Sequence, residues 1–192
     1  MWFSDRRRFL GSSTFLAAGV AALSLKTNSH GAAAAESATG AEARVRELGL
    51  ELREFSKPAA PFEPAVLVDN MLYLSGHGPR KPEGGFVTGK VGTALSLEEG
   101  QAAARLTGLD MLSSMRDALG SLDKVVRLVK VTGMVNSDQV FTKHPQVING
   151  FSELMIEIFG DQAGKGTRSA VGMSGLPFDI AVEIEAIFQV NV

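Results

Sequence analysis

The chain has 192 residues, a formal net charge of −2 and a pI near 5.9, so it carries no basic field that would attract a nucleic-acid backbone. Its single tryptophan and single tyrosine leave few platforms for stacking bases, and we expect no nucleic-acid partner. The absence of cysteine excludes disulfides, thiolate chemistry and a lipid anchor on cysteine.

The first 35 residues are predicted to form an export signal. Residues 6–10 read Arg-Arg-Arg-Phe-Leu, which is typical of a twin-arginine signal, and a short apolar stretch rich in small residues follows at 15–25. The small residues at 31–35 suit a signal peptidase. We therefore expect cleavage near Ala35, a periplasmic location and no stable membrane association afterwards. An uncleaved N-terminal anchor is the alternative.

A lead-in and a short amphipathic helix are predicted over residues 36–55, because apolar residues recur at three- and four-residue steps from Ala41 to the end of this range. Prolines then favour extended backbone. Two apolar runs, 65–68 and 71–75, are separated by an Asp-Asn pair that suits a tight turn. They predict a β-hairpin.

The rest of the chain alternates helices and strands. Residues 85–89, in a Gly-rich loop, are a candidate short strand. Ser96 and Glu99 have the spacing of a capping box, which predicts a helix that ends near Gly120. The remaining expected elements are a strand at 125–135, a helix at 145–159 and a final hairpin of strands 168–174 and 181–190.

This order, β-β-α-β-α-β-β, predicts one α+β domain over residues 56–192, with the helices on one face of a mixed sheet. In the last strand, apolar residues alternate with Glu183 and Glu185. Successive side chains of a strand point to opposite faces, so we expect these carboxylates on the face away from the helices.

Arg168 and Glu183, on the last two strands, are the candidate catalytic pair. An arginine can hold a carboxylate with two parallel hydrogen bonds, and a glutamate can accept a proton from water. Partial burial beside Glu185 is expected to raise the pKa of Glu183 towards a value useful for a base. The alternative is an ion pair of Arg168 with Glu183 or Glu185 that only stabilises the hairpin or an interface.

The C-terminal sequence resembles the signature of the RidA/YjgF family. The resemblance rests on Thr-Arg-Ser-Ala-Val-Gly at 167–172, Leu-Pro at 176–177 and Val-Glu-Ile-Glu-Ala at 182–186, and it extends over residues 56–192. It implies a chorismate-mutase-like fold and a homotrimer with a cleft at each subunit interface. It also implies an enamine/imine deaminase, which hydrolyses reactive 2-imino acids to 2-keto acids and ammonia without a cofactor.

The resemblance assigns roles to individual residues. It makes Arg168 the anchor of the substrate carboxylate and Glu183 the residue that activates water. Ser75 and Gly76 fall on positions that line the cleft.

The sequence departs from the family pattern at four positions. Phe62 replaces a tyrosine, Ala170 replaces a cysteine, His77 stands where glutamine is common, and Asn149 is only an approximate counterpart of a helix asparagine. Phe62 and His77 are expected to influence the size of the substrate.

Other functions stay open at this point. The loss of the tyrosine and cysteine equivalents, together with the predicted export, favours a non-catalytic periplasmic trimer that binds small acids or acts like a chaperone. Endoribonuclease, a label often attached to the family, is disfavoured by the acidic pI and the few aromatic platforms. The three scattered histidines lack the spacing of metal ligands, so we expect no metal site.

Overall fold

The computed structural model describes residues 40–55 and 59–192. The predicted export signal and most of the lead-in lie outside the described residues. Among the described residues, no helix has the length and apolarity needed to cross a membrane.

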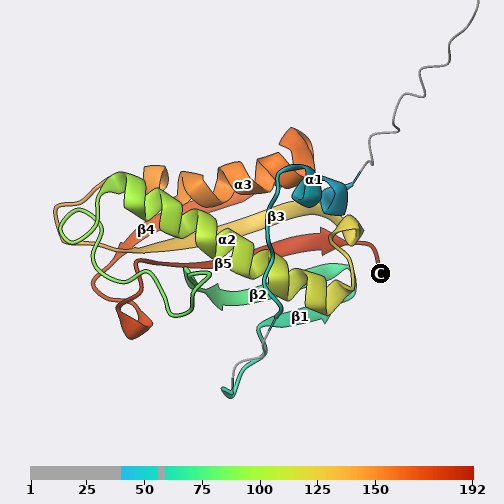
Figure 1. Cartoon of the computed structure of the whole chain (residues 1–192), viewed down its shortest axis with the longest axis horizontal. Helices are drawn as coiled ribbons and strands as arrows, with labels where there is room; N and C mark the ends of the chain where they lie inside the picture. Colours follow the sequence, from blue (N-terminus) through green and yellow to red (C-terminus); the bar gives the residue numbers. More distant parts are fainter. Residues whose placement is uncertain (1–39, 56–58) are drawn as a thin grey trace, which may run out of the picture. The chain divides into compact units, whose positions relative to one another are not determined.

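A single five-stranded mixed sheet forms the base of the domain (Figure 1). Its strands lie in the order β1-β2-β5-β3-β4; β3 and β4 are parallel, and every other neighbouring pair is antiparallel. The strand bounds are β1 Ala65–Val68, β2 Met71–His77, β3 Val125–Asn136, β4 Thr167–Met173 and β5 Val182–Val190.

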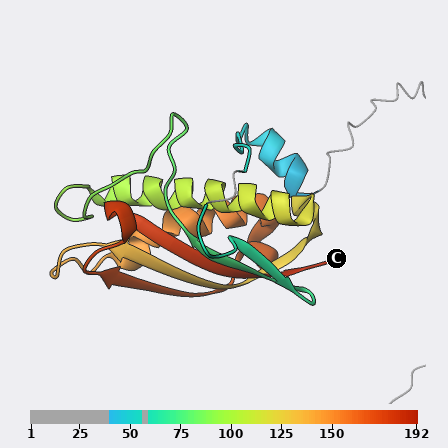
Figure 2. The same ribbon diagram turned by 90° about the horizontal axis from the view of Figure 1, so that it is seen from below.

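Two long helices, α2 (Leu97–Leu119) and α3 (His144–Gly164), cover one face of the sheet, and no helix of the described residues covers the other face (Figure 2). The Ser96 side chain accepts a hydrogen bond from the Glu99 backbone, and the Glu99 side chain accepts one from the Ser96 backbone, so the predicted capping box begins α2. Gly120, with φ 79°, ends that helix. The predicted fold class and element order are confirmed.

Close packing of α2, α3 and the sheet depends on residues without a side chain. A Cβ at Gly133 of β3 would lie 2.6 Å from a side-chain carbon of Ile148 on α3, and one at Gly150 would overlap the backbone oxygen of Gln101 on α2. The largest fully buried side chains of this core come from both helices and from the sheet: Phe151, Phe188, Leu72, Met111, Leu112 and Ile184.

The predicted final hairpin is wrong. β4 and β5 are not neighbours, because β3 lies between them and pairs with both. A parallel pair such as β3 and β4 needs a crossover connection, which α3 provides, and this places β4 at the edge of the sheet. The short turn before β5, including the 3-10 helix η2 (Pro177–Asp179), therefore links two strands that do not contact each other as a pair.

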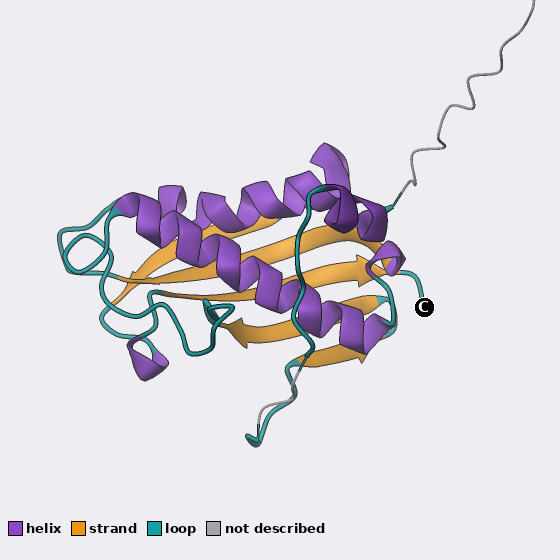
Figure 3. Ribbon diagram, in the orientation of Figure 1, coloured by secondary structure: helices purple, strands orange, loops and turns teal. Residues whose placement is uncertain are grey.

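Two local predictions also needed correction. The first helix, α1 (Ala41–Glu47), is shorter than expected because Gly49 adopts φ 61° and the Leu50 amide bonds back to the carbonyl of Val45. The rest of the expected helix instead runs as a loop across α2 (Figure 3). Residues 85–89 form isolated bridges, Arg80–Phe86 and Thr88–Ile180, and not a strand.

A second short helix, η1 (Leu122–Lys124), connects α2 to β3. Glu42 of α1 accepts hydrogen bonds from the Arg116 side chain of α2 and the Leu122 amide. The buried side chains of Ala41 and Val45 join the main core. Residues 41–55 therefore pack as part of the same domain as the sheet.

Candidate functional site

A cavity of about 470 Å³ lies beside the end of β2. Residues of β2, α2, β5 and three connecting segments line it. Five of the predicted site residues are among them: Phe62, Ser75, Gly76, His77 and Glu183. Its other lining residues include Arg53, Arg80, Asp110, Ser114, Phe86 and Phe178.

A β-bulge shapes the floor of this cavity. Leu74 pairs with Ala186 and His77 pairs with Ile184, so β2 has one residue more than β5 between these pairs. Gly76 lies in the bulge, and a Cβ there would overlap the carboxylate of Glu183. Glycine is therefore required at this position for the Glu183 side chain to occupy its place.

Glu183 has the environment of a base. Its side chain is half-buried, and within residues 40–55 and 59–192 no hydrogen-bond donor contacts its carboxylate. Burial raises the pKa of Glu183, and the negative charge of Glu185 raises it further. A carboxylate of this kind holds a proton more readily than an exposed glutamate does.

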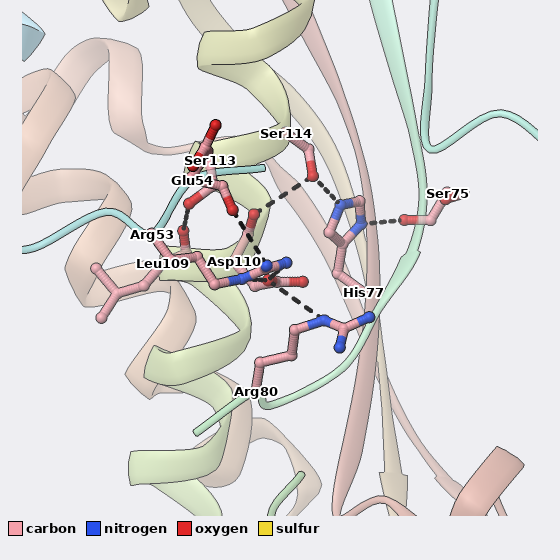
Figure 4. A network of polar contacts seen from close by, with 9 residues as sticks. All are labelled: Arg53, Glu54, Ser75, His77, Arg80, Leu109, Asp110, Ser113 and Ser114. Carbon is pink, nitrogen blue, oxygen red and sulfur yellow. Dashed lines mark hydrogen bonds and ion pairs between the residues drawn. The ribbon is translucent and has the colours of Figure 1, made fainter. Parts of the chain in front are cut away.

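His77 is buried and uses both ring nitrogens inside the chain (Figure 4). Nδ1 lies 2.7 Å from the carbonyl oxygen of Ser75, and Nε2 lies 2.8 Å from the hydroxyl of Ser114. Burial lowers the pKa of His77, so the neutral ring donates from Nδ1 and accepts from Ser114 at Nε2. Its role in the structure is to join β2 to α2 behind the cavity.

The cavity also holds a charged cluster that sequence reasoning missed. Asp110 of α2 is only 7% exposed, and it forms ion pairs with Arg53 and Arg80 (Figure 4). Arg53 comes from the loop that crosses α2, and Arg80 follows β2. The only sequence signal was an acidic residue within a buried stretch of α2, which indicates a partner without identifying it.

Arg168 and Asn149 lie together but outside this cavity. The Arg168 guanidinium donates to Asn149 Oδ1 at 3.0 Å, to Ser152 Oγ at 2.9 Å and to the Pro145 carbonyl at 3.3 Å. No ion pair joins it to Glu183 or Glu185 in the described part of the chain. Arg168 extends towards α3 from β4, whereas Glu183 lies on β5 with β3 between them. One chain by itself thus does not bring the predicted catalytic pair together.

Comparison with known proteins identifies the family. A family model described as "YjgF/chorismate mutase-like, putative endoribonuclease" matches residues 42–183. Protein TCP17 of Trypanosoma cruzi is 41% identical over 149 residues, which cover 78% of this chain and 93% of that protein. The chain belongs to the RidA/YjgF family.

Two solved structures support the fold of this RidA/YjgF chain. A protein of unknown function from Agrobacterium tumefaciens is 38% identical, with a TM-score of 0.70 over 79% of this chain and 94% of that one. A Shewanella oneidensis protein is 28% identical, with a TM-score of 0.75 over 79% of this chain and 100% of that one. The similarity covers nearly all of each neighbour's chain, so it applies to the whole domain.

Aromatic side chains form part of the cavity wall in this RidA/YjgF chain. Phe62 lines the cavity without a hydroxyl group, at the position where the family pattern has tyrosine. Phe86 and Phe178 stack with ring centroids 6.3 Å apart, and the Arg80 guanidinium lies over Phe86, 4.6 Å from its centroid. Among the described residues, no group of three or more His, Cys, Asp or Glu side chains is placed to hold a metal ion.

Proposed function

We propose that this protein hydrolyses reactive 2-imino acids to 2-keto acids and ammonia. The observation that carries the proposal is the Glu183 carboxylate, which is half-buried in the cavity above Gly76, lacks a donor among the described residues and has a raised pKa. Membership of the RidA/YjgF family supports the same chemistry. A base with a raised pKa accepts a proton more readily near neutral pH than an ordinary glutamate does.

The reaction needs one proton acceptor and a water molecule. Glu183 accepts a proton from water as the oxygen bonds to the imine carbon, and the electron pair of the C=N bond moves to nitrogen. The proton then passes to that nitrogen, the C–N bond breaks and ammonia leaves with its electron pair. The C=O bond forms as the Glu183 carboxylate accepts the remaining hydroxyl proton, which it then releases to solvent. A protonated imine is already electrophilic, so this scheme requires only groups that the chain supplies.

Arg168 is the proposed anchor for the 2-carboxylate, and it enters the site from a second copy of the chain. This arrangement is part of the proposal because Arg168 lies outside the cavity that contains Glu183 in its own chain. Arg168 is on the edge strand β4, and no described strand pairs with its outer side, where another copy can approach. A homotrimer with a cleft at each interface is the assembly that we propose.

The proposal places the reaction in the periplasm. Its support is the twin-arginine pattern at residues 6–10, which lies outside the described residues. The substrates would then be imines that reach or form in that compartment.

The decisive experiment measures loss of imines generated in situ by an amino-acid oxidase. We expect the purified protein to accelerate hydrolysis over the uncatalysed reaction, and Arg168→Ala and Glu183→Gln to lose most of that acceleration, by about 100-fold or more for the base. Gly76→Ala displaces the Glu183 carboxylate and should reduce the rate as well. Gly175→Ala is the matched control, since no atom lies within 4 Å of a Cβ there.

Failure to accelerate any small, branched or aromatic imine would rule out the deaminase. Binding of 2-keto acids without turnover would then identify a non-catalytic acid-binding protein, which the departures at Phe62 and Ala170 would favour. Salt-sensitive RNA binding and cleavage would instead point to the endoribonuclease label of the family model.

A further inference from the structure

Arg80 presents an unused pair of hydrogen-bond donors to the cavity. Its Nε lies 3.6 Å from Asp110 Oδ1, and its guanidinium lies over the Phe86 ring. Among residues 40–55 and 59–192, no acceptor bonds to either of its terminal nitrogens. The ion pair and the ring contact therefore fix the position of the guanidinium plane and leave its two terminal nitrogens available to a ligand.

Arg53, the other arginine of the cluster, has no such capacity. Its Nε and one terminal nitrogen contact Asp110, and its second terminal nitrogen donates to the Glu54 carbonyl at 3.3 Å. The single carboxylate of Asp110 is therefore shared by two guanidinium groups. Among the described residues, the cluster thus contains two guanidinium groups and one carboxylate.

The other titratable groups that line the cavity do not occupy these donors. The His77 ring bonds to Ser75 and Ser114, and Glu183 makes no ion pair in the described part of the chain. Two parallel donors on a positively charged guanidinium favour an anionic ligand, and above all a carboxylate.

We propose that Arg80 binds a second acid group of the ligand, so that the preferred substrates are 2-imino dicarboxylates. This inference rests on the proposed function, in which Arg168 of a second copy holds the 2-carboxylate. The volume of about 470 Å³ lies within the range of about 300–1,000 Å³ typical of ligand pockets, which leaves room for a chain of several carbons. Lysine at position 80 would retain the charge but not the paired donors.

The test is a calorimetric titration with two stable keto acids of equal length. We expect the full-length protein to bind 2-oxopentanedioate about 10- to 100-fold more tightly than 2-oxopentanoate, because hydrogen bonds to charged groups have this effect. Arg80→Gln should abolish the difference and leave the affinity for 2-oxopentanoate unchanged, and Arg80→Lys should retain part of it. Arg127→Gln is the matched control, since the described residues that accept hydrogen bonds from Arg127 are the carbonyls of Leu128 and Lys165, away from the cavity.

Several results would overturn the inference. In the unaltered protein, these are equal affinities for the two acids or binding of neither acid. In Arg80→Gln, they are a preference for the diacid that persists or an equal loss of both affinities. The unchanged affinity for 2-oxopentanoate also shows that the variant is folded. If the diacid binds through Arg80 but no imine is hydrolysed, the proposed function fails and the diacid site stands.

Discussion

Arg168 and Arg80 are both accessible to solvent, but different groups hold them. Three neutral oxygens at the start of α3 accept hydrogen bonds from Arg168. Arg80 is held by the carboxylate of Asp110 and by the face of Phe86, and neither contact uses its terminal nitrogens. Arg168 thus makes three hydrogen bonds to neutral acceptors, whereas the two terminal nitrogens of Arg80 have no acceptor among the described residues.

This difference indicates that, in a single chain, Arg80 is more readily available to a ligand than Arg168 is. A carboxylate that binds Arg168 must compete with Asn149, Ser152 and the Pro145 carbonyl, whereas one that binds Arg80 displaces no hydrogen bond with a described residue. Displacing existing hydrogen bonds lowers the net gain from new ones. Two predictions, on Asp110 and Asn149, test this comparison, and two on Glu185 and Glu183 sharpen the account of the base; the first three follow in order of decreasing effect.

The largest effect is expected from Asp110→Asn. Removal of the buried carboxylate leaves two guanidinium groups close together without a counter-charge. Loss of one partner of a fully buried ion pair costs about 3–5 kcal/mol, and we expect about 2–3 kcal/mol here, because the arginine side chains are 35% and 39% exposed. Urea denaturation measures the change in the free energy of unfolding.

The control for this variant is Glu157→Gln. Glu157 also pairs with an arginine, Arg105. Unlike Asp110, however, Glu157 is 37% exposed, and Arg105 is 35% exposed. We expect a loss below about 1 kcal/mol for this surface pair. Similar losses in the two variants would contradict the view that Asp110 is the buried centre of its cluster.

Asn149→Ala should have a smaller effect on stability. It removes one hydrogen bond to Arg168, and Ser152 and Pro145 still accept bonds from the same guanidinium. We expect the free energy of unfolding to fall by about 0.5–1 kcal/mol. The same variant should leave Arg168 freer to move, so an affinity for 2-oxopentanoate that falls more than tenfold would show that Asn149 contacts the ligand directly.

Glu185→Gln should produce the smallest change, which is a shift in the pH profile. Burial is the main cause of the raised pKa of Glu183, and the charge of Glu185 adds to it. The ionised base is the active form, so the rate should rise with pH through this raised pKa. Removal of the Glu185 charge should move the acidic limb to lower pH, and a shift in the opposite direction would contradict the assignment.

The pH dependence of stability has a defined sign for the same group. Between pH 4.5 and the raised pKa of Glu183, the folded state binds more protons than the unfolded state. The contribution of Glu183 to stability is therefore present at low pH and is lost as the pH rises through this window. Glu183→Gln should flatten this part of the stability curve.

Local signals in the sequence predicted much of the fold. The capping box of Ser96 and Glu99 and the terminal Gly120 defined α2 within a residue or two, because these contacts lie within one or two turns of the helix. The alternation along β5 correctly placed Glu183 and Glu185 on the opposite face from the buried residues. Both patterns depend only on neighbouring residues.

The features that the sequence did not predict depend on contacts between segments far apart in the chain. The position of β4 beside β3 follows from the crossover through α3, and nothing within β4 itself distinguishes it from a strand that pairs with β5. The Arg53–Asp110 contact joins residues 57 positions apart. No periodic pattern links such residues, so the charged cluster could be found only in the folded chain.

The bulge in β2 shapes the cavity but leaves the pairing of the core residues on its two sides intact. Leu74 and His77 on its two sides are both buried and are paired with Ala186 and Ile184. Shortening the chain by one residue between them would restore a regular ladder and leave both buried side chains facing the helices. A one-residue deletion there would therefore change the floor of the cavity beside Glu183 and leave the two core pairs in place.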